Sequence, residues 1–320
     1  MPIISRRAFG IGLLAAPALT TLSAGATLAA AHAAPKAAPA LFDAPLGNYR
    51  ITALFDGMAG LAKGFFFGPD QGAIDAALAA GGITGDAMPA PVTAFLLQSD
   101  DRTILIDAGM GAVDILGPGF GRTFDALAAM GVAPDDVDTI IVTHAHPDHI
   151  GGMIGEDGAT FANAEVVISE PEFGFWGDAA MMAQAPEDAQ GLFQLAQGVY
   201  AAYGDRIRPV AGGTEVAPGI TLELAPGHTP GHAVLAIDGG DRQLMMIADA
   251  LHSSVLQTAL PDTGFGFDID TAQAAASRRA LFDRMAADNM LVAGSHLPFP
   301  GFGRIIAHGD AYAYVPASWM

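Results

Sequence analysis

The chain has 320 residues, and its 14 Lys and Arg against 34 Asp and Glu give a formal net charge of −20 with histidine neutral. This charge argues against nucleic-acid binding, which requires a basic surface, and the absence of cysteine excludes disulfides, thiolate nucleophiles, Cys-ligated zinc and iron–sulfur clusters. With 51% hydrophobic and 15% charged residues, the composition is that of a globular enzyme whose metals would have nitrogen and oxygen ligands.

The first 33 residues are predicted to be an export signal and not part of the fold. Arg6 and Arg7 precede an apolar run rich in alanine, Ala8 to Ala31, and small residues suited to cleavage follow it. The paired arginines favour the twin-arginine route, which predicts a periplasmic or secreted protein. An uncleaved membrane anchor is the alternative, because the uncharged run is long enough to span about 30 Å of bilayer. Residues 34–48 are predicted to be a tether, rich in Ala and Pro at its start.

Residues 49–320 are predicted to form one α/β domain, in which apolar and β-branched runs alternate with segments of helical spacing. The predicted strands are Tyr49–Phe55, Val92–Gln98, Thr103–Asp107, Thr139–Thr143, Glu165–Ser169, Ile220–Ala225, Ala233–Asp238 and Gln243–Ala248. The predicted helices are Gly72–Ala80, Thr123–Met130, Pro186–Tyr203 and Thr271–Ala287. Two runs of strands, each closed by helices, favour two sheets packed face to face with helices outside, which is a sandwich of four layers.

The densest group of potential metal ligands follows the strand predicted at Thr139–Thr143. His144, His146, Asp148 and His149 fall within six positions at the end of this strand. A single buried histidine is usually structural, but three crowded imidazoles would repel one another once protonated. A cation between them keeps them neutral and deprotonated, so the spacing predicts a metal site.

Three more candidate ligands, His228, Asp249 and His296, each follow an apolar run farther along the chain. In α/β proteins, functional groups gather at the carboxyl ends of strands. With the first group they make seven ligands, more than the four that one zinc ion prefers. The sequence therefore predicts two divalent metal ions, with zinc preferred and manganese, iron or cobalt as alternatives.

The pattern His144-x-His146-x-Asp148-His149, followed by His228, Asp249 and His296, resembles that of the metallo-β-lactamase superfamily. The resemblance covers the chain from Tyr49 to Trp319 and implies an αβ/βα sandwich with a dinuclear centre. It implies that His144, His146 and His228 hold the first metal. It implies further that Asp148, His149 and His296 hold the second metal, with the Asp249 carboxylate bridging the two.

Within this superfamily, the segment 295–301 and the helix that carries Arg278 and Arg279 are similar to the methyl parathion hydrolase branch. This narrower resemblance implies that Trp176 and Phe193 are aromatic residues of the substrate pocket, with ordinary core packing as the alternative. Leu116 stands where that branch often has another aromatic residue. The resemblance also suggests a homodimer. The run 65–67, three phenylalanines, would pack in that dimer or close over the pocket.

The resemblance and the charges of two ions predict hydrolysis of an ester-type bond by a hydroxide that bridges the ions. Asp148 or Asp249 would take up or orient the proton. Asp107, which ends another predicted strand, would orient a ligand histidine, or else would cap a turn. His232 and His252 lie near ligands in the sequence and would either touch the site or pack in the core.

Three functions remain in competition. The first is hydrolysis of phosphotriesters or aryl esters, as in the methyl parathion hydrolase branch. The second is hydrolysis of N-acyl homoserine lactones or other lactones, which uses the same hydroxide on a cyclic ester. The third is metal binding without catalysis, which is disfavoured because all seven ligand positions are filled. The expected partner of the first two is a small-molecule ester, lactone or phosphotriester.

Overall fold

The computed structural model describes residues 38–68 and 70–318, so the export signal predicted for residues 1–33 lies outside the described residues. The tether prediction for residues 34–48 is corrected in part, because this range contains strand β1 (Leu41–Leu46), which pairs antiparallel with β2 (Tyr49–Ala62). Ala44 and Leu46 point to the same face of β1 and are buried in the core. Burial of these two side chains explains why the segment joins the sheet.

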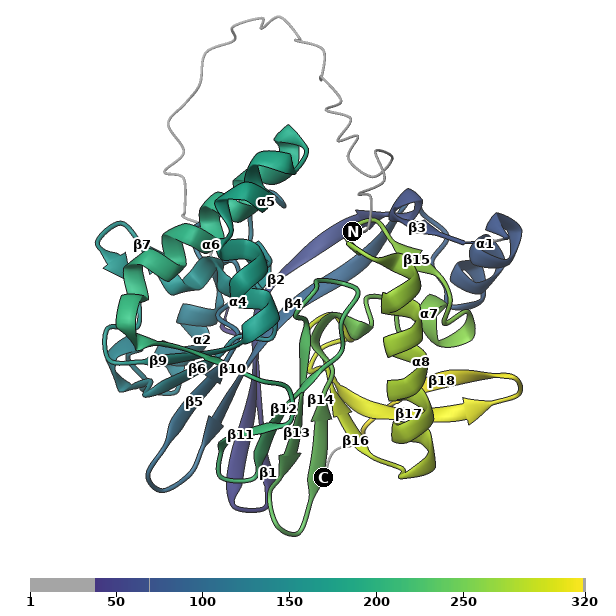
Figure 1. Cartoon of the computed structure of the whole chain (residues 1–320). Helices are drawn as coiled ribbons and strands as arrows, with labels where there is room; N and C mark the ends of the chain where they lie inside the picture. The colour runs from purple at the N-terminus through teal and green to yellow at the C-terminus, as the bar shows by residue number, and fades with distance from the viewer. Residues whose placement is uncertain (1–37, 69, 319–320) are drawn as a thin grey trace, which may run out of the picture.

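Two mixed sheets of seven strands each form the centre of the molecule (Figure 1). The first sheet has the order β1, β2, β4 (Ala87–Gln98), β5 (Thr103–Ile106), β6 (Thr139–Ile141), β9 (Glu165–Ser169) and β10 (Ile207–Val210). The second has the order β11 (Thr214–Ala217), β12 (Ile220–Leu224), β13 (Ala233–Asp238), β14 (Gln243–Met246), β16 (Leu291–Ala293), β17 (Phe302–His308) and β18 (Ala311–Pro316). Two short pairs, β3 (Phe66–Phe67) with β15 (Gly264–Phe265) and β7 (Ile154–Gly155) with β8 (Gly158–Ala159), lie apart from them.

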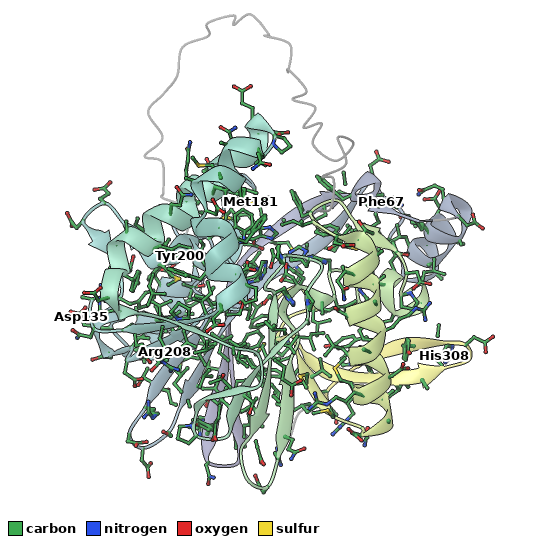
Figure 2. The ribbon with its side chains drawn as sticks, viewed as in Figure 1. Phe67, Asp135, Met181, Tyr200, Arg208 and His308 are labelled. Carbon is green, nitrogen blue, oxygen red and sulfur yellow. The ribbon has the colours of Figure 1, made fainter. Side chains whose placement is uncertain are left out.

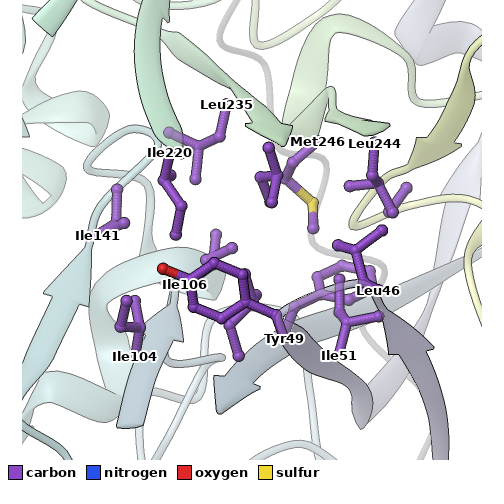
Figure 3. Close-up of a cluster of buried hydrophobic side chains, with 14 of the residues drawn as sticks. Leu46, Tyr49, Ile51, Ile104, Ile106, Ile141, Ile220, Leu235, Leu244 and Met246 are labelled. Atoms are coloured by element: carbon purple, nitrogen blue, oxygen red, sulfur yellow. The ribbon is translucent and has the colours of Figure 1, made fainter. Parts of the chain in front are cut away.

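The inner faces of the two sheets meet in one apolar core (Figure 3). It includes Ile106 and Ile141 from the first sheet and Ile220, Leu235 and Met246 from the second. All five side chains are buried. Since close-packed interiors transmit strain and compress little, this core holds the ends of both sheets in a fixed relation.

Helices cover the outer faces of both sheets, which confirms the predicted sandwich of four layers (Figure 1). Side chains of α2 (Thr123–Ala129), α4 (Glu170–Gly177) and α6 (Gln190–Tyr203) pack on the first sheet, and those of α8 (Thr271–Ala287) pack on the second. The other helices are α1 (Gln71–Ala80), α3 (Pro147–Ile150), α5 (Ala179–Gln184) and α7 (Leu256–Ala259). Among the described residues, no helix has the length and apolar character needed to span a membrane.

Strand β2 is longer than predicted, because it continues to Ala62 past an irregularity at Asp56. The Asp56 carboxylate is fully buried and accepts hydrogen bonds from Met110 N at 2.9 Å, Gly121 N at 3.1 Å and Thr123 N at 3.0 Å. The bulge therefore anchors both ends of the loop that joins β5 to α2.

We predict that Leu235→Ala lowers the free energy of unfolding by about 2–5 kcal/mol, because it leaves a cavity between the sheets. Leu224→Ala on the neighbouring strand β12 is the matched control, since Leu224 is 40% exposed. The control should change this free energy by less than about 1 kcal/mol. Denaturant unfolding of the two variants measures both values, and equal losses would contradict the assignment of the core.

Candidate metal centre

Four of the predicted ligands leave the first sheet together, just after β6. His146 precedes α3, and Pro147 occupies the first position of that helix. Proline is well suited there, because a helix leaves its first N–H groups without intrahelical partners. The single turn of α3 then carries Asp148 and His149 beside His144 and His146.

The other three predicted ligands come from the second sheet. His228, Asp249 and His296 follow β12, β14 and β16, respectively. Next to them, Ala233 N donates a hydrogen bond to Thr143 O at 2.9 Å, a backbone bond between the β6 loop and the start of β13. Loops from both sheets thus meet at one edge of the sandwich.

His144, His146 and His228 form one buried group of converging nitrogens. His146 Nδ1 lies 3.1 Å from His144 Nε2 and 2.9 Å from His228 Nε2. Three imidazole nitrogens at such distances can all direct a lone pair at a single cation, as in zinc sites with three histidines.

Asp148, His149 and His296 form a second group. Asp148 Oδ2 lies 3.6 Å from His149 Nε2 and 3.5 Å from His296 Nε2. Asp249 lies between the groups, because its Oδ1 is 3.1 Å from His149 Nε2 and its Oδ2 is 3.3 Å from His228 Nε2. The structure therefore brings all seven predicted ligands into one continuous cluster.

Two buried atoms of this cluster, His149 Nε2 and Asp249 Oδ1, lack a hydrogen bond. They face each other at 3.1 Å, but without the geometry of a hydrogen bond. Leaving a buried polar atom unpaired costs about 1–3 kcal/mol, and such atoms are rare in folded proteins. A cation that both atoms coordinate removes this cost, so the residues fit a divalent metal.

The charges of the cluster also favour a cation. Burial, and then the facing His149, hold the pKa of His144 well below its usual range. Burial acts in the same direction on His228, but hydrogen bonds to carboxylates, Asp249 first, raise its pKa to about 9. Burial opposes ionisation of Asp249, yet the imidazoles around it, His296 first, hold the pKa of its carboxyl well below the usual range. A divalent ion would supply the positive charge that the ionised Asp249 carboxylate favours. It would also leave the imidazole nitrogens unprotonated, so that they can coordinate the ion.

Asp107 makes the contact that orienting a ligand histidine requires, since its Oδ2 lies 2.7 Å from His149 Nδ1. The same carboxylate accepts hydrogen bonds from Thr143 N at 2.9 Å and from Thr143 Oγ1 at 2.8 Å. Its backbone has a φ of +56°, a left-handed conformation that few residues other than glycine adopt. The side chain thus joins the end of β5 to the loop after β6.

Two further groups that orient ligands were not predicted from the sequence. Asp268 Oδ1 lies 3.0 Å from His228 Nδ1, and Pro91 O lies 2.8 Å from His296 Nδ1. Asp268 follows β15, where no neighbouring ligand marks it, and a backbone carbonyl leaves no trace in the residue type.

His232 and His252 both contact Asp249, in different ways. His232 Nε2 accepts a hydrogen bond from Asp249 N at 3.1 Å, and burial lowers its pKa to about 3, so the ring is neutral. His252 Nε2 lies 3.0 Å from Asp249 Oδ2, and the ring stacks on Phe265 with centroids 3.9 Å apart. His232 therefore positions the backbone of a ligand, whereas His252 faces the cavity described next.

A cavity opens onto the ligand cluster. Its polar end includes ligands of both metal groups together with His252. Its remaining wall is mostly apolar and includes Val92, Leu116, Leu192 and Phe265. This lining suits a small molecule that has both a polar and an apolar part.

Of the three residues predicted to form the substrate pocket, Leu116 lines this cavity, whereas Trp176 and Phe193 do not. Trp176 and Phe193 are buried between α4 and α6, with ring centroids 4.6 Å apart, which corrects the expectation that they wall the pocket. The next residue along the chain, Leu192, faces the cavity instead. Trp176 nevertheless supports the site from behind, since its ring lies 5.6 Å from that of His146.

The run of three phenylalanines backs the cavity wall. Phe65 stacks on Phe267, and Phe66 packs against Phe265, each with ring centroids 5.1 Å apart. Phe265 and Phe267 line the cavity. Phe67 lies at the surface and is 44% exposed (Figure 2).

We predict that Asp249→Ala reduces turnover at least about 100-fold and lowers the metal content, because this carboxylate contacts both ligand groups. Metal analysis of protein purified without added salts, together with a hydrolysis assay, measures both effects. Asp157→Ala, which changes an exposed carboxylate in the β7–β8 turn, should leave both unchanged. An active, fully metallated Asp249→Ala protein would refute the bridging position of this residue.

Comparison with known proteins gives relatives that match about half of this chain. An N-acyl homoserine lactonase from Bacillus sp is 30% identical over 171 residues, which cover 48% of this chain and 61% of that protein. A probable metallo-hydrolase of Mycobacterium tuberculosis is 28% identical over 184 residues, which cover 49% of this chain and 56% of that protein. The chain thus matches less than two thirds of the length of these relatives.

Two solved structures are similar over most of the chain. The hydrolase AbOPH of the beta lactamase superfamily has a TM-score of 0.83 and 29% identity, covering 89% of this chain and 100% of that chain. AidC, a dizinc quorum-quenching lactonase in complex with a product, N-hexanoyl-L-homoserine, has a TM-score of 0.80 and 26% identity, covering 88% and 99%. The profile of the metallo-beta-lactamase superfamily matches residues 87–296, a range that contains all seven ligands. The chain therefore belongs to the metallo-beta-lactamase superfamily.

Proposed function

We propose that this protein is a metal-dependent hydrolase that opens the lactone ring of N-acyl homoserine lactones. The observation that carries the proposal is the cavity, whose apolar wall ends on the metal ligands. An N-acyl homoserine lactone has the same division, because its apolar acyl chain is joined to a polar cyclic ester. Burial of the acyl chain against residues such as Leu116 and Leu192 would stabilise the complex by about 0.8 kcal/mol per CH₂ group.

The relatives support the lactone over the phosphotriester or aryl ester, which was the first function considered. Curated relatives are named N-acyl homoserine lactonases, and AidC was solved with the product of lactone hydrolysis.

The proposal includes two divalent ions, with zinc preferred, held by His144, His146 and His228 and by Asp148, His149 and His296, with Asp249 between them. When bound, such ions would supply a water of lowered pKa and would polarise the carbonyl oxygen of the ester. The residues that line the cavity would hold the ester at this point.

The proton released by the attacking water has to reach the ring oxygen that leaves. Water adds a hydroxyl group to the carbonyl carbon, the bond from that carbon to the ring oxygen breaks, and the ring oxygen leaves needing a proton. Asp148 lines the cavity, so its carboxylate can hold the proton in transit, whereas the low pKa of Asp249 and its place between the two groups suit a metal ligand. The product is a hydroxy acid, and no other reactant is consumed.

The experiment compares three substrates on the metal-loaded protein: N-hexanoyl homoserine lactone, a triester of the paraoxon type and an aryl acetate. We expect kcat/KM for the lactone to exceed both others at least about tenfold, a difference of about 1.4 kcal/mol in the barrier. Protein stripped with a chelator should be inactive, and zinc should restore it.

Each other outcome selects a different function. Faster hydrolysis of the triester or aryl acetate would overturn the proposal in favour of the first function considered. Hydrolysis of none of the three, with both metals bound, would favour metal binding without catalysis.

We also propose that the protein is exported and acts as a homodimer. The export signal rests on Arg6, Arg7 and the apolar run that follows them. Cell fractionation should find the protein outside the cytoplasm and should find a variant with both arginines changed to lysine inside it.

Light scattering tests the homodimer. It should give twice the mass of one chain, and the mass of a single chain would contradict the dimer.

A further inference from the structure

Glu172 is a buried carboxylate that the proposed reaction does not use. It lies near the start of α4 and has no exposed surface. Its Oε1 accepts hydrogen bonds from Ala145 N at 2.8 Å and from Trp176 Nε1 at 2.7 Å. Its Oε2 accepts hydrogen bonds from Thr229 Oγ1 at 2.7 Å and from Gly231 N at 3.0 Å.

Three of these four donors belong to the two loops that carry the first group of metal ligands. Ala145 separates His144 from His146, and Thr229 follows His228 directly. These loops come from different sheets, so the carboxylate is a direct link between them.

The contacts around this carboxylate leave little room for movement. A side-chain carbon added at Gly231 would collide with the backbone of Glu172, so the His228 loop packs directly on α4. Ser169, which caps the helix, donates from its Oγ to Gly231 O at 2.6 Å. Trp176 presents its ring to His146 from the next turn of α4. The start of α4 thus contacts both loops through several independent groups.

The hydrogen bonds also favour the ionised form of this group. Three of the donors are N–H groups, which can only donate, so both carboxylate oxygens act as acceptors. Burial raises the pKa of the carboxyl, and these hydrogen bonds oppose the rise. A negative charge behind the imidazoles of the first group favours a cation among them.

We propose that Glu172 is a positioning residue for the first metal group, where it holds the His144–His146 loop and the His228 loop at the separation that metal binding requires. It touches no ligand and acts through Ala145, Thr229 and Gly231. The inference concerns metal binding and does not depend on which ester is hydrolysed.

The main test is Glu172→Gln, which keeps the shape but turns one oxygen into an NH₂ group. The Thr229 hydroxyl can turn to accept from this group, but Gly231 N cannot, so a donor is left facing a donor. We expect the affinity of the first metal group to fall about 10–100-fold, the range typical for groups that orient metal ligands. Competition with a chelator measures the affinity, and the absorption spectrum of the Co²⁺-loaded protein reports a change in coordination.

A matched control separates this effect from the loss of any acid. Glu170→Gln makes the same chemical change two residues earlier on the same helix, at an exposed position. It should leave both the metal affinity and the Co²⁺ spectrum unchanged.

Thermal unfolding with and without metal separates positioning from folding. A residue needed only for folding lowers the two Tm values in parallel and leaves the gap between them unchanged. A positioning residue narrows the gap, because weaker binding stabilises the folded state less.

A second variant, Thr229→Val, removes one donor and keeps the carboxylate, and it replaces the first test if Glu172→Gln does not fold. We expect its metal affinity to fall several-fold, by less than that of Glu172→Gln. Wild-type metal affinity with an unchanged Co²⁺ spectrum, in whichever of these variants folds, would overturn the proposal. These measurements use no substrate, so they remain informative if the protein is not a lactonase.

Discussion

The structure depends on the burial of ionisable groups that would each be more stable in water. Five imidazoles and two carboxylates meet in the ligand cluster, and six of these seven side chains are buried. Removing such groups from water costs several kcal/mol each unless they find partners. The ring nitrogens that point away from the cluster centre have partners such as Asp107 and Asp268. The nitrogens and oxygens that point toward the centre face one another. Positive charge at the centre of the cluster, which a divalent ion would supply, would balance these groups.

The candidate ligands come from both sheets. The two facing sheets deliver the side chains of the cluster from opposite sides. The relation of the two ligand sets is then set by the core between the sheets, by the backbone bond from Ala233 N to Thr143 O and by Glu172. The geometry of the site therefore depends on how the two sheets pack.

The side chains of the cluster could be identified from the sequence as candidate metal ligands because the signal is local. His144 to His149 lie within one turn, and each later ligand follows an apolar strand that the composition reveals. The groups that hold the ligands could not be found in this way. Asp268 lies 40 residues from His228, and Glu172 lies 57 residues from Thr229, so only the folded chain pairs them.

The predictions of the pocket residues and of the first strand failed for other physical reasons. A step of one residue turns a helical side chain by about 100°, so the choice between Leu192 and Phe193 needed the orientation of α6, which the sequence does not fix. Strand β1 follows a stretch rich in alanine and proline, and only its pairing with β2 shows that it belongs to the sheet.

The left-handed backbone conformation at Asp107 costs stability, but the site uses the side chain of this residue. Glycine is the residue that this conformation suits best, and it would relieve strain of about 1 kcal/mol. It would also remove the carboxylate that holds Thr143 and His149. Selection for thermal stability alone would therefore favour glycine here and would remove a contact of the candidate metal centre. Engineering of this scaffold for thermostability should leave Asp107 unchanged.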